Sequence, residues 1–450
     1  MQIDEKVKNR ILLWAVIISR IVFGGVFLFS GFVKAIDPVG SAYKFDDYFA
    51  AFGLSALNIF SLPLAFSVAA FEFYLGANTL LGANKKRTPL LDLLFMLFMT
   101  PLTLYLAIAN PVSDCGCFGD ALILTNWETF FKNLVLLALA FVLVRYNTRV
   151  KAVYDEAVQG LVSLYIVLYS LILSTIGSHY EPILDFRPYK RGVNISEAMS
   201  IPEGAPEAQY KTTVVYRKDG KEHSFPLEEL PELDSTWVFV ETVNEQIEKG
   251  YEPPIKDFSV LSQQGEDITE KLLTDPRFAF WMIAPSLKEA DDDGIDRLNE
   301  LYDYCAEQGY NFICLTASDA RESDEWRDNT GAEYGYAFAD KKMLMTILRS
   351  NPGVMLVKDG TIYWKASTHS LPDEWTEAPL DQTRFTQIVY NPQRRLLFLL
   401  LALTLPLVIL FLTEKGVKLA VLKFRERQRE KRLRFIRKHR AELRKNSEES

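Results

Sequence analysis

Two cysteines separated by a single glycine give the strongest chemical signal in the sequence. Cys115 and Cys117 lie in the short segment Asp114–Asp120, between two long apolar runs, and they are two of only four cysteines in the chain. Because cysteine reacts as the thiolate, exposure and local charge decide what such a pair does. A disulfide closed over one residue makes a small ring, and strained disulfides are more oxidising than structural ones. The spacing therefore favours thiol–disulfide exchange.

Two other roles stay open for this pair. A disulfide without turnover could simply staple the loop, and the absence of a Cys-x-x-Cys motif counts against a redox role. A Cys-x-Cys pair can also chelate a metal, but the four histidines are scattered and none has ligand spacing to another, so we expect no metal site. Only the first role would make the chain a membrane thiol–disulfide oxidoreductase, and the sequence leaves its enzymatic status undecided.

Six apolar runs predict an α-helical membrane bundle. Each has about the length that an α-helix needs to cross roughly 30 Å of hydrocarbon. The first run is too long for the apolar core of a signal peptide and no A-x-A-like cleavage site follows it, so we expect an uncleaved helix. The runs cover about Ile11–Val33, Leu57–Leu81, Leu90–Ala109, Trp127–Val144, Gly160–Ile176 and Arg395–Leu412.

Charge distribution predicts the orientation of these helices. Lys and Arg gather before the first run, at 85–87, at 145–151 and in the tail 414–450, whereas the segment 178–394 has 40 acidic and 22 basic residues. The positive-inside rule then places both termini in the cytoplasm of a multi-pass protein of the bacterial inner (cytoplasmic) membrane. The cysteine loop and the segment 178–394 would lie on the extracytoplasmic side.

The basic tail has two readings. It either continues the last helix into the cytoplasm or lies as a helix on anionic lipid. Its 14 basic and 6 acidic residues would also suit nucleic acid by charge. Nothing else in the sequence supports that partner, so the expected partners are the lipid bilayer and an extracytoplasmic client protein, with no nucleic acid.

Arg20 and Glu72 are charged residues inside the first and second apolar runs. Such residues are rare in membranes and are expected to have a partner. Each lies about ten residues from the inner end of its run, so both would be roughly 15 Å deep and able to meet. They could form an ion pair that fixes helix register, or line a polar pocket for a quinone head group or a proton path. Small residues in the same helices permit close packing: Gly24, Gly25, Ser30, Gly31, Gly76, Ala77 and Gly82.

The segment 178–394 predicts a soluble α/β domain behind a connector. Strands at 212–216 and 223–225 flank an Asp-Gly turn signal, and 237–242 alternates like a third strand. Strands at 258–261, 278–283 and 310–315, helices at 295–305 and 343–348, and a hairpin at 354–365 follow. Strand–helix–strand followed by helix–Pro–hairpin is similar to the order of a thioredoxin-like fold.

The likeness to thioredoxin-like domains includes one departure. In that family the first buried strand leads into Cys-x-x-Cys, whereas here the strand that ends at Ile283 leads into Ala284–Lys288 without a cysteine. Pro352 fits the family's cis-proline position. Cys305 and Cys314 lie in apolar settings, where we expect buried free thiols, with a redox pair as the alternative.

The first third of the chain resembles the DoxX family. Arg20, the run Phe29–Lys34 (Phe-Ser-Gly-Phe-Val-Lys) and Asp37-Pro38 are similar to that family's first helix and its exit. Four helices with Glu72 in the second and Cys-Gly-Cys-Phe-Gly in the last loop look like its MauE (methylamine-utilisation) branch. The resemblance covers about residues 11–145. It implies formation of disulfides in, or maturation of, a periplasmic partner, and relatives are associated with quinone-linked sulfur oxidation.

These observations predict a six-helix membrane protein with an N-terminal four-helix DoxX-like core and a soluble thioredoxin-like domain. The expected domains are 1–150 (membrane core), 151–177 (fifth helix), 178–250 (connector), 251–385 (thioredoxin-like), 393–413 (sixth helix) and 414–450 (tail). The favoured function is extracytoplasmic thiol–disulfide exchange at Cys115 and Cys117, with Arg20 and Glu72 at a quinone site. The alternative is a non-catalytic assembly factor whose degenerate thioredoxin-like domain is a binding module.

Overall fold

The computed structural model describes residues 5–206, 209–218, 221–227, 230, 236–248, 250–372, 379–380, 384–386 and 391–448. They form two compact units, one made of Met1–Phe186 with Asn391–Ser450 and the other of Arg187–Tyr390.

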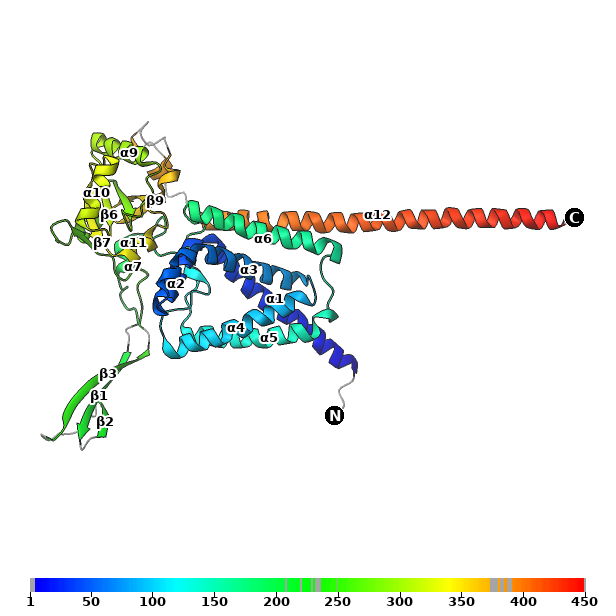
Figure 1. The fold of residues 1–450 in the computed structure, drawn as a ribbon, viewed down its shortest axis with the longest axis horizontal. Coiled ribbons are helices and arrows are strands. Elements are labelled where there is room, and N and C mark those ends of the chain that lie inside the picture. The colour runs from blue at the N-terminus through cyan, green and yellow to red at the C-terminus, as the bar shows by residue number, and fades with distance from the viewer. Residues whose placement is uncertain are drawn as a thin grey trace. The chain divides into compact units, whose positions relative to one another are not determined.

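The first unit is helical. Among the described residues, six helical stretches are long and apolar enough to cross a membrane, which confirms the six predicted spans. Five of them are α1 (Glu5–Ile36), α3 (Ser61–Leu81, extended by the 3-10 turn η1, Ser55–Phe60), α4 (Arg87–Ala109), α5 (Asn126–Tyr146) and α6 (Glu156–His179). The sixth is the first part of α12 (Pro392–Glu448), which continues as one helix through the basic tail (Figure 1). Short 3-10 turns, η2 (Gly119–Ala121) and η3 (Asn147–Arg149), lie on either side of α5.

A helix that the sequence did not predict lies between the first two spans. Helix α2 covers Pro38–Ala51. Its start is well specified, because the Asp37 side chain accepts a hydrogen bond from the Gly40 amide and Pro38 occupies the first turn. The resulting helix carries Lys44 and Tyr48, which both reach the cysteine loop.

Helices α1 and α3 pack so closely that the glycines at their contact cannot be replaced without a clash. A Cβ atom at Gly31 would collide with the backbone of Phe73, and one at Gly76 would collide with the backbone of Leu28. These contacts confirm the close packing expected from the small residues. They also fix the antiparallel register of the two helices, so that residues near 30 in α1 lie level with residues near 72 in α3.

The other helices pack on either side of this pair. Phe23 and Phe27 of α1 share an apolar cluster with Met96 of α4 and Leu136 of α5. On the other side, α6 and α12 share a cluster with α1 and α3. Two hydrogen bonds link α6 to α12. The Tyr165 and Tyr169 hydroxyls of α6 donate to the carbonyls of Ala402 and Leu399.

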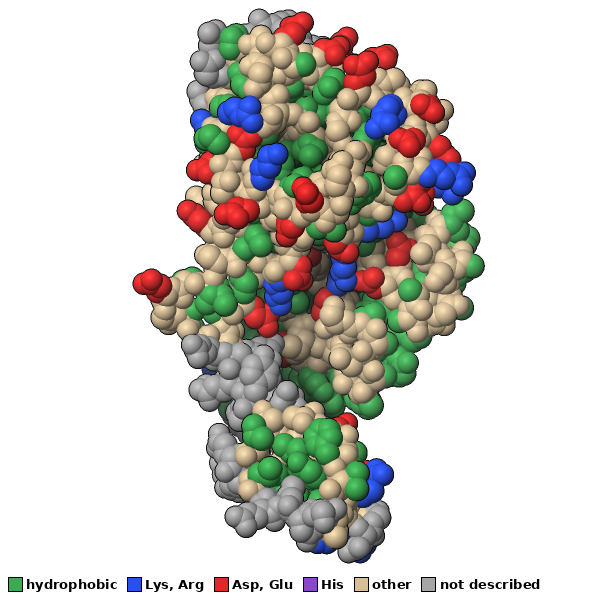
Figure 2. Space-filling view, turned by 90° about the vertical axis from the view of Figure 1, so that its left-hand side faces the viewer, with side chains coloured by type: hydrophobic (Ala, Val, Ile, Leu, Met, Phe, Trp, Pro, Cys, Tyr) green, Lys and Arg blue, Asp and Glu red, His purple; other side chains and the backbone are tan. Residues whose placement is uncertain are grey.

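The second unit contains a small antiparallel sheet. Its strands are β1 (Gln209–Lys218), β2 (Lys221–Pro226) and β3 (Val238–Glu248), in the order β2-β1-β3. The predicted hairpin is confirmed by the β1–β2 pairing, although its Asp219-Gly220 turn lies outside the described residues. Figure 2 shows hydrophobic side chains on this sheet, and Val238 and Phe239 are more than half exposed.

The rest of the second unit is an α/β region, which confirms that part of the predicted fold class. Its six-stranded sheet has the order β4-β7-β6-β5-β8-β9, with β5 parallel to β6 and antiparallel to β8. The strands are β4 (Val260–Ser262), β5 (Ala279–Ala284), β6 (Asn311–Thr316), β7 (Gly335–Ala339), β8 (Gly353–Lys358) and β9 (Thr361–Ser367). The helices are α7 (Ile195–Met199), α8 (Thr269–Leu273), α9 (Ile295–Gln308), α10 (Ala320–Thr330) and α11 (Lys341–Ile347); short 3-10 turns follow at Thr368–Ser370 and Arg384–Thr386.

The predicted strands and helices of this region are present, with additions. Helix α8 lies between β4 and β5, where no element was predicted. Helix α10 and strand β7 lie between β6 and α11, where the sequence reading had no element. The Asn351–Pro352 peptide bond is cis. The α/β class is thus observed, while the thioredoxin-like assignment stays a prediction.

Cys305 and Cys314 are free and buried, as expected from their apolar surroundings. Burial raises the pKa of the Cys305 thiol to about 12, and it raises the pKa of the Cys314 thiol further above its usual value. Neither thiol is therefore ionised at neutral pH in the folded unit, so the α/β region offers no reactive dithiol at these positions.

Candidate functional site

A buried ion pair stands at the centre of the candidate site. Lys34 Nζ lies 2.6 Å from Glu72 Oε2, and both side chains are more than nine-tenths buried. Ser30, one helical turn before Lys34 in α1, has its hydroxyl oxygen 2.7 Å from the same carboxylate oxygen and receives a hydrogen bond from Lys34. A charge buried this deeply is tolerated only when it is paired and hydrogen-bonded.

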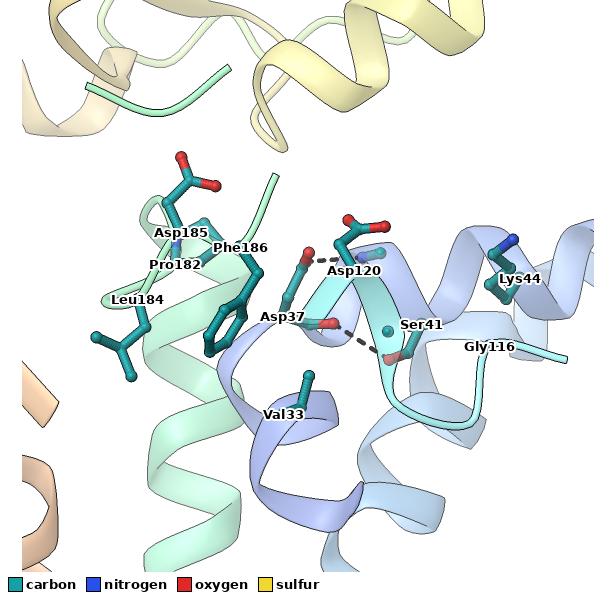
Figure 3. A pocket seen from close by; sticks show the side chains of 12 residues that line it. Val33, Asp37, Ser41, Lys44, Gly116, Asp120, Pro182, Leu184, Asp185 and Phe186 are labelled. Carbon is teal, nitrogen blue, oxygen red and sulfur yellow. Dashed lines mark hydrogen bonds between the residues drawn. The ribbon is translucent and has the colours of Figure 1, made fainter. Parts of the chain in front are cut away.

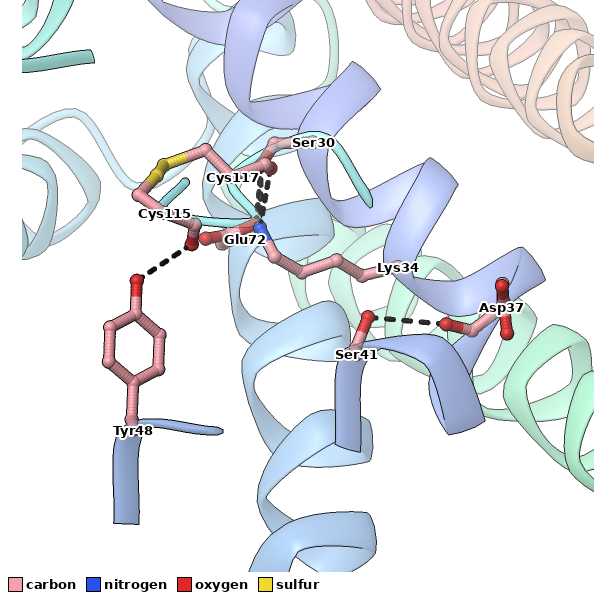
Figure 4. Close-up of polar contacts among 8 residues, drawn as sticks. All are labelled: Ser30, Lys34, Asp37, Ser41, Tyr48, Glu72, Cys115 and Cys117. Carbon is pink, nitrogen blue, oxygen red and sulfur yellow. Dashed lines mark hydrogen bonds and ion pairs between the residues drawn. A yellow bond between two sulfur atoms is a disulfide. The ribbon is translucent and has the colours of Figure 1, made fainter. Parts of the chain in front are cut away.

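This ion pair holds the cysteine loop by its backbone. Lys34 Nζ donates to the carbonyl oxygen of Cys117 at 2.8 Å. The Ser30 hydroxyl oxygen lies 2.6 Å from the same carbonyl, and its single proton can be donated either there or to Glu72. The Tyr48 hydroxyl of α2 donates to the carbonyl of Cys115 at 3.0 Å. Cys115 and Cys117 are joined by a disulfide, and Figure 4 shows it at the edge of this hydrogen-bond network. Three helices thus position one two-cysteine loop.

A second ion pair fixes the entry to the loop. Lys44 Nζ lies 2.7 Å from Asp114 Oδ2, and the other oxygen of Asp114 accepts from the Gly116 amide. Burial alone would raise the pKa of Asp114, but the hydrogen bonds and charge of Lys44 hold the pKa of this carboxyl below its usual value. Gly116 has a positive φ of 63°, which glycine adopts without strain.

Lys132 of α5 brings a third cation to the loop. Its ammonium lies 4.5 Å from the centroid of the Phe118 ring, a cation–π contact with the residue after Cys117. Lys132 and Cys117 line one narrow pocket together with Ser30 and Glu72. The apolar wall of this pocket comes from α1, α4 and α5: Val26, Phe27, Phe95, Met96, Met99 and Leu136.

A second narrow pocket lies on the other side of the loop. Lys44 and Gly116 line it together with the carboxylates Asp37, Asp120 and Asp185. Figure 3 shows Asp37 hydrogen-bonded at the start of α2, with Phe186 pointing toward it from the segment after α6. The cysteine loop is thus bordered by two narrow pockets with charged residues in their linings, one between membrane helices and one at the end of the bundle.

Arg20 and Glu72 do not pair, which corrects the expected contact. Arg20 donates to the side chain and carbonyl of Asn147 and to the carbonyls of Val150 and Lys151. It lies level with Gly82, whose Cβ would collide with the guanidinium. Arg20 therefore joins the middle of α1 to the ends of α3 and α5, about 15 Å along α1 from Ser30. Of the two residues assigned to a quinone site, Glu72 lies beside the cysteine loop and Arg20 does not.

Sequence reasoning missed most of the residues that hold the loop. Lys34 is predicted only as part of a family-like run, and Ser30 only in that run and as a small packing residue. Lys44, Tyr48 and Lys132 are not singled out. One signal was available, because Ser30 and Lys34 are four residues apart and share a helix face with the small residues that meet α3. For metals, the group of possible ligands found among the described residues is the exposed cluster Asp291–Asp293, which includes neither cysteine of the loop.

The fold and the site together define a polytopic membrane protein that presents a disulfide at the end of a helical bundle. Residues 12–146 match the family model described as Methylamine utilisation protein MauE, which supports the predicted resemblance for that part of the chain. Residues 210–249 match a model described as a domain of unknown function (DUF8463). No curated protein matches the chain.

Proposed function

We propose that this membrane protein carries out thiol–disulfide exchange with an extracytoplasmic partner protein and so assists the partner's maturation. The observation that carries the proposal is the Cys115–Cys117 disulfide, set among Lys34, Lys44 and Lys132. Cations near a cysteine pair favour thiolates, which are the reactive form in exchange. The match of residues 12–146 to the methylamine-utilisation family model agrees with a role in maturation.

The proposed location is the bacterial inner membrane, with the termini in the cytoplasm and the cysteine loop outside. The support is the distribution of Lys and Arg around the six apolar helices. The segment 178–394, with a net charge of −18, would then be extracytoplasmic. Because its described cysteines are buried, we assign this thioredoxin-like domain to client docking and leave the exchange to Cys115 and Cys117.

A lipid-soluble quinone is the class of acceptor that we propose for reoxidising the pair. An apolar cavity of about 500 Å³ lies between α1, α3 and α12, with Phe29 in its lining. The Phe29 ring lies 5.5 Å from the ring of Phe118, next to Cys117. Two electrons and two protons from the dithiol would convert a quinone to its hydroquinone. Purified, reduced protein mixed with ubiquinone or menaquinone tests this, and a dithiol that stays reduced would exclude the quinone.

The exchange itself is tested by trapping. Cys115→Ser and Cys117→Ser leave one thiol each. The remaining thiolate can attack a disulfide of the partner and form a mixed disulfide, which the variant has no second loop cysteine to resolve. We expect partner adducts in membranes that carry one of these variants, adducts that disappear after reduction. Cys305→Ser is the control, because that buried thiol lies outside the loop. Absence of adducts from both variants, with full function in the double variant, would remove the redox proposal.

A non-catalytic role is the second candidate, and one observation favours it. The carbonyl groups of both cysteines are hydrogen-bonded to side chains of the bundle, as expected for a disulfide that only closes a loop. Such a clasp would have a reduction potential below about −300 mV, whereas an exchange centre would lie higher. An equilibrium titration against glutathione or dithiothreitol separates these cases.

A further inference from the structure

The two cysteines have different charged neighbours. Cys117 has two ammonium groups close by, because Lys34 donates to its carbonyl and Lys132 lines the same pocket and lies on the Phe118 ring. One carboxylate, Glu72, faces the same pocket and is paired with Lys34. The balance of charge beside Cys117 is therefore positive.

The neighbours of Cys115 carry no such excess of positive charge. Asp114 precedes it, and the carboxylate of Asp114 is matched by the single ammonium of Lys44. The group that bonds the carbonyl of Cys115 is the Tyr48 hydroxyl. Burial, followed by the charges of Asp114 and Asp47, raises the pKa of Tyr48 well above its usual value, so the phenol is neutral. A thiolate is accordingly better stabilised at Cys117 than at Cys115.

We propose that exchange has a fixed direction: the incoming thiolate bonds to Cys115 Sγ, and Cys117 leaves as the thiolate, with Lys132 as the positioning residue that stabilises it. This assignment rests on the exchange proposed above. In disulfide exchange a thiol with a lower pKa leaves faster, so the site's charge asymmetry selects the sulfur that departs.

A dithiol of the client protein is the reductant of the Cys115–Cys117 disulfide. A client thiol first loses its proton to solvent. Its sulfur bonds to Cys115 Sγ while the Cys115–Cys117 bond breaks, and the electron pair of that bond goes to Cys117. The client's second thiolate then attacks the mixed disulfide and releases Cys115 as a thiolate. The client gains a disulfide, and the pair becomes a dithiol.

The direction can be read with glutathione, without knowing the client. Oxidised full-length protein in detergent is exposed briefly to glutathione, free thiols are blocked with N-ethylmaleimide, and peptides containing residues 114–120 are mapped by mass spectrometry. We expect glutathione on Cys115 and maleimide on Cys117, in an excess of about tenfold over the reverse pattern. Equal labelling, or an excess on Cys117, would overturn the assignment.

Lys132 is tested in the same assay. Lys132→Met should slow adduct formation by about threefold and reduce the excess on Cys115, because the leaving thiolate loses a cation. Lys132→Arg should restore both values, and Lys8→Met removes an exposed cation at the start of α1 as a matched control. A rate and ratio unchanged in Lys132→Met would remove its positioning role.

Failure of the direction and failure of the function give different results. Glutathione on Cys117, together with trapped client adducts, overturns the direction alone. No adduct on either cysteine, in protein whose disulfide dithiothreitol still reduces, overturns both the direction and the proposed exchange.

Discussion

At the scale of single residues, the site is a disulfide held by ion pairs. Lys34 and Glu72 fix the far side of the loop at Cys117, and Lys44 with Asp114 fixes its entry. The cysteines could be found from their spacing, because few structural pairs are separated by one glycine. The lysines could not, since a lysine near the end of an apolar run is ordinarily taken as an interfacial residue that reaches toward water.

Breaking the buried pair should destabilise the membrane bundle. Lys34→Met leaves Glu72 buried without its cation, and loss of one partner of a buried pair typically costs about 3–5 kcal/mol. We expect a clearly lower thermal midpoint in detergent for Lys34→Met and for Glu72→Leu. The double variant should recover part of the loss because no lone charge remains. Lys8→Met is the control. Thermal midpoints of Lys34→Met and Glu72→Leu equal to that of the wild type would contradict a stabilising role for the ion pair.

The Asp114 contact that restrains the cysteine loop should be lost at acidic pH. Lys44 lowers the pKa of Asp114 below the ordinary value of 3.8, so the stability that this ionised carboxyl contributes is present above pH 3.8 and is lost as the pH falls through its folded-state pKa. Reduction of the disulfide by a phosphine, followed from pH 6 to pH 2.5, should therefore accelerate at the acidic end. In Asp114→Asn the phosphine should reduce the disulfide rapidly at every pH. A wild-type profile without an acidic rise would show that the Asp114 contact does not restrain the loop.

At the scale of elements, hydropathy located the spans but not their relative depth. Counting from the edges of the apolar runs placed Arg20 level with Glu72, whereas Arg20 lies level with Gly82, ten residues further along the chain. The close contacts of Gly31 and Gly76 decide the register instead. A hydropathy profile reports which residues avoid water, and it contains no information about which glycine meets which backbone.

Glycines on the two sides of α1 should differ in their tolerance of alanine. Gly31→Ala should disrupt the bundle, because a Cβ there collides with the backbone of Phe73, whereas a Cβ at Gly25 meets nothing within 4 Å. Gly25→Ala should be neutral or stabilising by up to about 1 kcal/mol, since alanine favours the helix. Yield and thermal midpoint in detergent measure the difference. Equal behaviour of the two variants would mean that the α1–α3 contact does not set the packing.

At the scale of the whole molecule, the sequence predicted the helical and α/β parts but not every element. Strand β5 was predictable because all its residues are apolar and buried. Helix α10 was not, because most of its residues are polar and only Ser323 and Trp326 are buried, which leaves almost no periodic signal. The division of Lys and Arg along the chain predicts an orientation for the helical bundle.

This orientation predicts the side of the membrane from which each cysteine can be labelled. In intact cells treated with a reductant, a maleimide that cannot cross membranes should label Cys115 and Cys117, because the loop would face outward. Cys305 and Cys314 should stay unlabelled until the protein is denatured, since both are buried. A cysteine introduced at Ser67, on a lipid-exposed helix position, should resist labelling, and one introduced at exposed Arg425 should react only after the cells are opened. If Arg425→Cys were labelled from outside while Cys115 and Cys117 were not, the proposed topology would be reversed. An extracytoplasmic client could then not reach the cysteine loop.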